Sequence, residues 1–118
     1  MPSPVIHARA LQDALKKFTL ERGWQPYNSP KNLVSALSVE AAELLEHFVW
    51  LGPEESYAVM ENLNTAQGVR DELADVFNLL LQIADALEVD LERASLEKMA
   101  KNALKYPLED KPENGKTQ

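Results

Sequence analysis

Two pairs of acidic residues in this sequence have a spacing that suits metal binding. Glu40 and Glu43 lie three residues apart, and Glu72 and Asp75 repeat that spacing. On an α-helix, residues three apart share a face, so each pair presents two carboxylates together. Carboxylate oxygens, in a chain without cysteine, favour Mg²⁺, or Mn²⁺ in its place, over zinc or copper. These spacings predict a Mg²⁺ site formed by Glu40, Glu43, Glu72 and Asp75.

The same carboxylates fall at the margins of apolar helix faces. On a helical wheel Glu40 lies about 20° from Leu33, and Glu72 lies between Leu79 and Ile83. An ionised carboxylate in such a position costs on the order of several kcal/mol unless a cation accompanies it. If the two helices form an antiparallel hairpin, the two acidic pairs face each other at the same height. A cation between them would then offset their mutual repulsion.

The elements that must position these residues are all expected to be helices. Apolar residues recur every three or four positions and β-branched residues are sparse, which predicts helices and no strand. We expect four main helices, over residues 5–22, 30–51, 67–87 and 91–104, and a short one over 53–60. Gly23 is placed to end the first helix, and Ser29 and Asp90 are placed to cap the second and the last.

The fold class that follows is all-α, a four-helix bundle-like single domain over residues 1–108. The expected core face of the second helix consists of Leu33, Val34, Leu37, Ala41, Leu44, Leu45 and Phe48. Because so small a domain leaves apolar surface uncovered, we expect homo-oligomerisation, as a dimer or tetramer, to complete it. Residues 109–118 are too polar to fold alone and are expected to form a disordered tail.

Composition narrows the possible partners. A length of 118 residues suits one modest core, and a formal charge of −7 would repel a polymeric nucleic acid. A single nucleotide can still bind if metal ions stand between the two sets of negative charge. The sequence has no cysteine, no segment typical of a signal peptide and no apolar run as long as a membrane span. We therefore expect a cytoplasmic protein that binds neither polymeric nucleic acid nor a membrane.

Four segments together resemble a known enzyme family. Residues 37–50, Leu-Ser-Val-Glu-Ala-Ala-Glu-Leu-Leu-Glu-His-Phe-Val-Trp, closely resemble the signature of the all-α nucleoside triphosphate pyrophosphohydrolases, the MazG-like and dCTP pyrophosphatase-like group. Residues 71–76 resemble its second motif, Glu-x-x-Asp, and residues 29–33 resemble the start of its second helix. Lys98, Asn102 and residues 105–107 resemble its C-terminal element, so the resemblance covers roughly residues 8–107.

The resemblance implies hydrolysis of a nucleoside triphosphate between the α and β phosphates, with Mg²⁺ required. It implies that Glu40, Glu43, Glu72 and Asp75 are the metal ligands. Glu43 and Glu46 are both placed to orient or deprotonate the attacking water, and the choice between them stays open. The substrate-binding residues that the resemblance implies are Trp24, Lys31, Trp50, Lys98, Asn102 and Tyr106.

Two positions depart from the family pattern. Asn28 stands where many relatives have histidine, and Leu15 stands where dCTP-specific members resemble one another in carrying histidine. The expected substrate is therefore a nucleoside triphosphate, with dCTP or a modified deoxynucleotide as candidates and the base left open.

Two other interpretations fit parts of the pattern. A ferritin-like di-iron bundle needs Glu-x-x-His on two helices, and this chain has none. A non-catalytic helical interaction module would use its acidic faces only for solvation and would bind a partner protein. Such a module predicts that Mg²⁺ has no effect on melting, whereas a true site is stabilised by its ligand.

Overall fold

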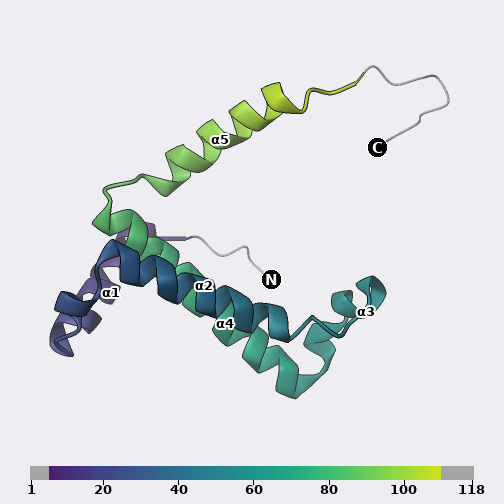
Figure 1. Cartoon of the computed structure of the whole chain (residues 1–118), viewed down its shortest axis with the longest axis horizontal. Helices are drawn as coiled ribbons and strands as arrows, with labels where there is room; N and C mark the ends of the chain where they lie inside the picture. The colour runs from purple at the N-terminus through teal and green to yellow at the C-terminus, as the bar shows by residue number, and fades with distance from the viewer. Residues whose placement is uncertain (1–5, 110–118) are drawn as a thin grey trace. The chain divides into compact units, whose positions relative to one another are not determined.

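The structure is a computed structural model that describes residues 6–109 (Figure 1). Its elements are, in order, α1 (Ala8–Glu21), η1 (Gln25–Tyr27), α2 (Pro30–Glu46), α3 (Pro53–Tyr57), η2 (Val59–Glu61), α4 (Leu63–Ala86) and α5 (Leu91–Lys105). Residues 6–109 contain no strand, which confirms the all-α prediction. Among these helices none is long and apolar enough to cross a membrane.

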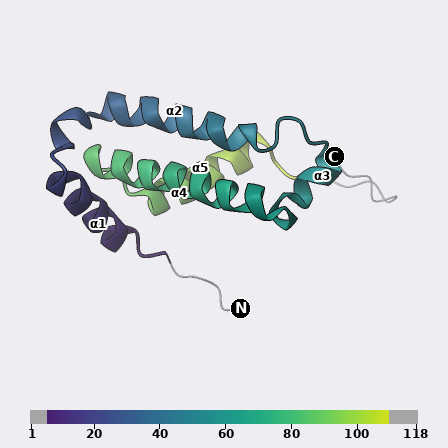
Figure 2. The same ribbon diagram turned by 90° about the horizontal axis from the view of Figure 1, so that it is seen from below.

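The chain divides into two compact units, one up to Glu88 and one from Val89 onward. In the first unit α2 and α4 run alongside each other in opposite directions (Figure 2), and α1 packs against α4. The second unit contains α5. The single domain over residues 1–108 stays a prediction, and the predicted tail lies outside the described residues except for Glu109.

Side-chain caps and a glycine set the helix ends as predicted. The Oγ of Ser29 accepts a hydrogen bond from the Asn32 N–H at 3.2 Å. Asp90 accepts one from the Arg93 N–H at 3.0 Å. Gly23, two residues beyond the end of α1, has a φ of +68°, a conformation that glycine adopts at no steric cost.

The helix ends that differ most from the prediction are those of α2 and α4. α2 ends at Glu46, not near residue 51, because the following N–H groups bond to the carbonyl three residues back, as in Phe48 to Leu45 at 2.8 Å. These tighter turns replace the last turn of the expected α-helix. α4 begins at Leu63, four residues before the predicted start, because the Oδ1 of Asn62 accepts from the N–H groups of Asn64 and Thr65.

The buried face of α2 is also rotated from the prediction. The half-buried and buried positions are Leu33, Ala36, Leu37, Glu40, Glu43, Leu44, His47 and Phe48. Val34, Ala41 and Leu45, which we expected in the core, are exposed. The reason is that α2 meets α4 along the edge that carries Glu40 and Glu43. The apolar flank on the other side of this edge has no partner within the described part of the chain.

Polar contacts hold α1 against α4. The side-chain amide of Gln12 donates to the carbonyl of Leu81 at 2.9 Å. Arg9 and Lys16 both contact the carboxylate of Asp85, at 3.0 and 3.4 Å. Partial burial by itself raises the pKa of Asp85, but the hydrogen bonds and charges of Arg9 and Lys16 outweigh it and leave the pKa below its ordinary value. α1 is thereby fixed where it can form one wall of a site.

Candidate functional site

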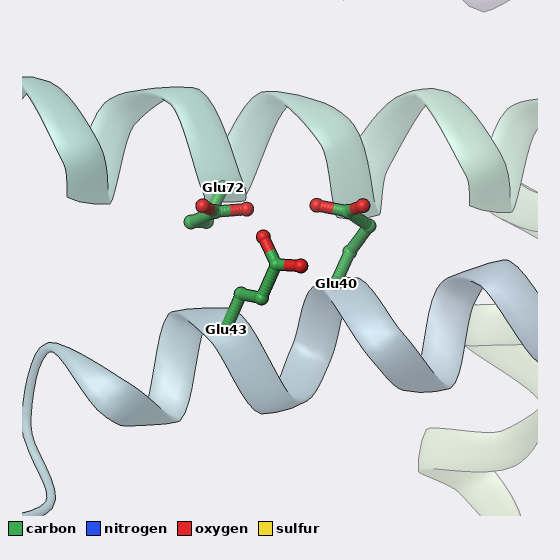
Figure 3. Close-up of side chains that lie close together, drawn as sticks. All are labelled: Glu40, Glu43 and Glu72. Atoms are coloured by element: carbon green, nitrogen blue, oxygen red, sulfur yellow. The ribbon is translucent and has the colours of Figure 1, made fainter.

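Three carboxylates converge between α2 and α4. Glu40 and Glu43 project from α2 toward Glu72 on α4 (Figure 3), and one oxygen of each lies within 4.8 Å of the other two. We call these three residues the carboxylate trio. All three side chains are half-buried. The antiparallel pairing of the two helices brings the two predicted motifs to the same height, as the spacing indicated.

Apolar neighbours on both helices surround the carboxylate trio where α2 and α4 meet. On α4, Val69 is buried three residues before Glu72, and Val76 is half-buried four residues after it. On α2, Leu37 and Leu44 flank the two glutamates and are themselves half-buried. Glu72 therefore lies within an apolar stripe, which confirms its predicted position.

The pKa values of two of these carboxyl groups are raised. The pKa of Glu40 rises to about 7, first because its carboxyl shares a hydrogen bond with that of Glu72, and then through burial and the charges of Glu43 and Asp75. The pKa of Glu43 is also raised, chiefly by the charge of Glu72. Without a cation, Glu40 therefore keeps its proton until the pH rises to about 7.

One oxygen of the cluster has no partner. The Oε1 of Glu72 is buried and accepts no hydrogen bond from the described residues. A buried carboxylate oxygen is normally satisfied by a donor or a cation. The donor set consists of carboxylate oxygens, which is what a hard cation such as Mg²⁺ or Mn²⁺ requires. The residues present thus fit a divalent metal ion.

Asp75, the fourth predicted ligand, lies beside the carboxylate trio and not within it. Its side chain is exposed, and its charge contributes to the raised pKa of both Glu40 and Glu43. Asp75 and Glu40 together line the adjoining cavity. The role of Asp75 as a ligand stays a prediction.

A cavity of about 330 Å³ adjoins the carboxylates. Its wall is formed by parts of α1, α2 and α4 and by residues on either side of η1. Glu40 and Asp75 are on this wall, and so are Phe18 and Trp24, whose rings meet edge to face with centroids 5.6 Å apart. Trp24, predicted from sequence as a substrate contact, is therefore on the wall of this cavity. Its position suits an aromatic or apolar group of a ligand.

Amide side chains form much of the polar wall of this cavity. They are Asn28, Asn32, Asn78 and Gln82. The Asn32 amide already donates to the carbonyl of Tyr27 at 2.8 Å. Sequence reasoning missed Asn78 and Gln82, although a signal existed, because they follow Asp75 by three and seven residues and so share its side of α4.

The remaining predicted residues lie elsewhere. Glu46 is exposed on the last turn of α2, and its charge adds to the raised pKa of Glu43. Lys31 is exposed in the first turn of α2 and is not on the cavity wall. Trp50 is 91% exposed in the turns that follow α2. The structure does not bring Lys31 or Trp50 to the carboxylates.

Three more predicted substrate contacts lie in the second unit. Lys98 and Asn102 are on α5, and Tyr106 follows its last residue; all three are exposed. The ammonium group of Lys105 lies 5.3 Å from the centre of the Tyr106 ring. Their predicted roles stay predictions.

Comparison with known proteins relates the chain to pyrophosphatases. Residues 35–118 match the MazG-like family. The chain is 35% identical to dCTP pyrophosphatase 1 of Rattus norvegicus over 92 residues, which is 78% of this chain and 54% of that protein. It is 35% identical to the Homo sapiens protein of the same name over 91 residues, 77% of this chain and 54% of that one. The chain thus spans about half the length of these curated relatives.

The chain also resembles a solved structure, and this match covers a larger share of the matched protein than the matches to the curated relatives do. A crystal structure of a pyrophosphatase from Archaeoglobus fulgidus superposes with a TM-score of 0.79 at 38% sequence identity. The match covers 92% of this chain and 99% of that one. The helical architecture described above is therefore shared with a pyrophosphatase.

Proposed function

We propose that this chain, which belongs to the MazG-like family, is a divalent-cation-dependent nucleoside triphosphate pyrophosphohydrolase. It converts a nucleoside triphosphate to the monophosphate and pyrophosphate. The observation that carries the proposal is the carboxylate trio beside a cavity with aromatic and amide groups on its wall. The names of the relatives, dCTP pyrophosphatase and pyrophosphatase, support it.

In this proposal the carboxylate trio holds Mg²⁺, or Mn²⁺ in its place, and Asp75 completes the ligand set. The ion, when bound, neutralises phosphate charge and lowers the pKa of a bound water. The unpartnered Oε1 of Glu72 then gains a partner, and the positive charge of the ion favours the ionised forms of Glu40 and Glu43, whose pKa values are raised without it. Both carboxyl groups can then be ionised at neutral pH.

A carboxylate must also orient or deprotonate the attacking water. Glu43 belongs to the carboxylate trio, so its oxygens are committed to the cation. Glu46 lies one turn further along α2, is exposed, and stays outside the cluster. We assign the proton-accepting role to Glu46 and the ligand role to Glu43. Substituting each by glutamine separates the roles, because Glu46→Gln then lowers kcat while the Mg²⁺ affinity stays unchanged.

The nucleobase occupies the cavity. Beyond Glu40 and Asp75 the cavity wall carries no charged side chain, which suits an uncharged base better than phosphate. Trp24 provides an aromatic surface, while the amides of Asn78 and Gln82 offer donors and acceptors to the base edge. Leu15 lines the same cavity with an apolar side chain, at the position where dCTP-specific members resemble one another in carrying histidine. The substrate is thus a deoxynucleoside triphosphate, dCTP or a modified relative, whose base is read by these amides.

Lys31, Lys98, Asn102, Tyr106 and Trp50 provide the remaining substrate contacts in this proposal. Lysine and tyrosine side chains can donate to phosphate oxygens, and tryptophan can stack on a base or sugar. The protein acts in the cytoplasm as a homo-oligomer. The exposed apolar flank of α2 supports a dimer or tetramer, because such surface is normally covered in a stable protein.

One experiment tests the activity directly. The purified protein is incubated with a panel of ribo-, deoxy- and modified nucleoside triphosphates, with Mg²⁺ or with EDTA, and the products are separated by ion-exchange chromatography. We expect a nucleoside monophosphate and pyrophosphate from one substrate class, and only with the metal ion. Release of orthophosphate, or no turnover across the panel, would contradict the proposal.

A further inference from the structure

A glycine in the middle of α4 marks an unusually close contact. A Cβ built on Gly68 would lie 2.5 Å from Cε1, 2.9 Å from Nε2 and 3.4 Å from Nδ1 of His47. The imidazole therefore rests directly on the α4 backbone, and no larger residue fits there without a shift. Glycine inside a helix is destabilising relative to alanine. The contact with His47 gives a physical reason for glycine at this position.

The contact lies next to the carboxylate trio. His47 caps the end of α2, four residues after Glu43, and Gly68 lies four residues before Glu72. Because α2 and α4 are antiparallel, His47 meets Gly68 about 6 Å along the helix axis from the point where Glu43 meets Glu72. Helices are stiff over a single turn, so the spacing of the backbones at one point constrains the spacing at the other.

The backbone of His47 is anchored, whereas its side chain borders open space. Its backbone N–H bonds to the carbonyls of Leu44 and Leu45, which anchors it at the end of α2. Its side chain also borders a second cavity of about 170 Å³, with Leu51 and Glu55 among the other residues on the wall. The imidazole thus lies between the α4 backbone and this cavity, and the cavity is a direction in which it can yield.

We propose that His47 and Gly68 are positioning residues that set the separation of α2 and α4 at the carboxylate trio, and thereby its affinity for a divalent cation. This inference rests on the proposed metal site. Gly68 allows the helices to approach until the imidazole touches the backbone. A methyl group at Gly68 pushes the helices apart and spreads the carboxylates of Glu43 and Glu72 away from a common ion.

The test is a rescue experiment on the full chain. Mg²⁺ and Mn²⁺ affinities are measured by calorimetric titration for the unchanged protein, Gly68→Ala, and the double variant His47→Ala with Gly68→Ala. We expect Gly68→Ala to weaken cation binding by about tenfold, the size of effect seen for groups that orient metal ligands. The double variant should bind within about threefold of the unchanged protein, because removal of the imidazole makes room for the methyl group.

A matched control separates the contact from a general effect of replacing glycine. A Cβ on Gly52 would lie 3.7 Å from Oε1 of Glu55, an ordinary contact distance, so Gly52→Ala should leave cation affinity unchanged. Melting temperatures without metal show whether each variant is folded, independently of activity. If Gly68→Ala fails to fold, the double variant still tests the role of the contact. The inference predicts that the double variant folds and binds the cation.

Several results would overturn the inference. Unchanged affinity in Gly68→Ala would mean that the imidazole simply swings into the neighbouring cavity. Weak binding in the double variant as well would place the effect in the backbone of α4 and not in the contact. If the unchanged protein binds neither cation, the proposed metal site itself falls, together with this inference.

Discussion

Glu72 combines two properties that a structural glutamate rarely has, an apolar surrounding and a buried oxygen without a hydrogen-bond partner among residues 6–109. Glu72→Gln should lower kcat/KM by about 100-fold or more, because even groups outside the ligand shell contribute up to about 100-fold. Without metal, the variant should be as stable as the unchanged protein or more so, since a repelling charge is removed. Steady-state kinetics and thermal melting measure the two effects. The control is Asp71→Asn, because Asp71 is an exposed neighbour of Glu72. This variant should keep the kcat/KM and the melting temperature of the unchanged protein.

The raised pKa of Glu40 predicts how stability depends on pH. The folded protein holds this proton up to about pH 7, whereas the unfolded chain releases it near 4.5. Between these values the folded state binds more protons, so the contribution of this group to stability is full below pH 4.5 and is lost as pH rises through 7. Urea unfolding from pH 5 to 8 without metal should show this loss, and Glu40→Gln should reduce it.

Added Mg²⁺ gives the complementary result. Because cation binding requires ionised carboxylates, it competes with the proton on Glu40 and strengthens as pH rises. Stabilisation by Mg²⁺ should therefore be small at pH 5 and large at pH 8. Stabilisation of equal size at both pH values would show that the carboxylate trio is not where the ion binds.

Gln82 tests how the base is recognised. Gln82→Leu removes the amide from the cavity at similar size, and loss of one hydrogen bond should lower kcat/KM for the preferred base by about tenfold. The ratio of kcat/KM values between bases should fall with it. Gln12→Leu is the matched control, because the Gln12 amide donates to the Leu81 carbonyl and so joins α1 to α4. That control should lose stability and keep its base preference.

At the scale of elements, the end of α4 carries a local strain. Glu88 has a φ of +57°, in the left-handed region that glycine tolerates and glutamate does not favour. Glu88→Gly should raise the free energy of unfolding by roughly 0.5 kcal/mol, after the greater freedom of glycine in the unfolded chain is counted. Glu88→Ala keeps the strain and should give no gain. Chemical denaturation of the three proteins compares them.

The elements also show what could be predicted from sequence. Local signals succeeded: Ser29 and Asp90 cap their helices, and Gly23 adopts the conformation that ends α1. The carboxylate trio was predictable because helical spacing and an antiparallel hairpin are enough to bring the motifs together. Asn78 and Gln82 were missed because amides on helices are common, and only the folded cavity distinguishes them.

The buried face of α2 could not be predicted for a different reason. Val34 and Leu45 are apolar, but apolarity alone does not say whether a residue packs within its own chain or against another copy. In the structure the seam with α4 runs through Glu40 and Glu43, so charged residues occupy half-buried positions while apolar ones are exposed. Such an exchange is expected where function competes with packing.

At the scale of the whole molecule, that apolar flank is the basis for an oligomer. Val34, Ala41 and Leu45 lie within about 40° of one another around α2, and Leu45 is 59% exposed. If a second copy covers this flank, Leu45→Glu places a charge in the interface and should convert the protein to a monomer. Within a lone chain the same change only adds a charge to the surface and should cost less than about 0.5 kcal/mol.

The control for this change lies on the same helix. Val39 is 54% exposed and points about 140° away from Val34 around α2, so Val39→Glu adds an equal charge outside the flank. Light scattering coupled to size exclusion should show a dimer or tetramer for the unchanged protein and for Val39→Glu, and a monomer for Leu45→Glu. A monomer in all three cases would mean that the flank is uncovered in solution. An unchanged oligomer in Leu45→Glu would place the interface on other exposed apolar residues, such as Leu73 and Leu80 of α4.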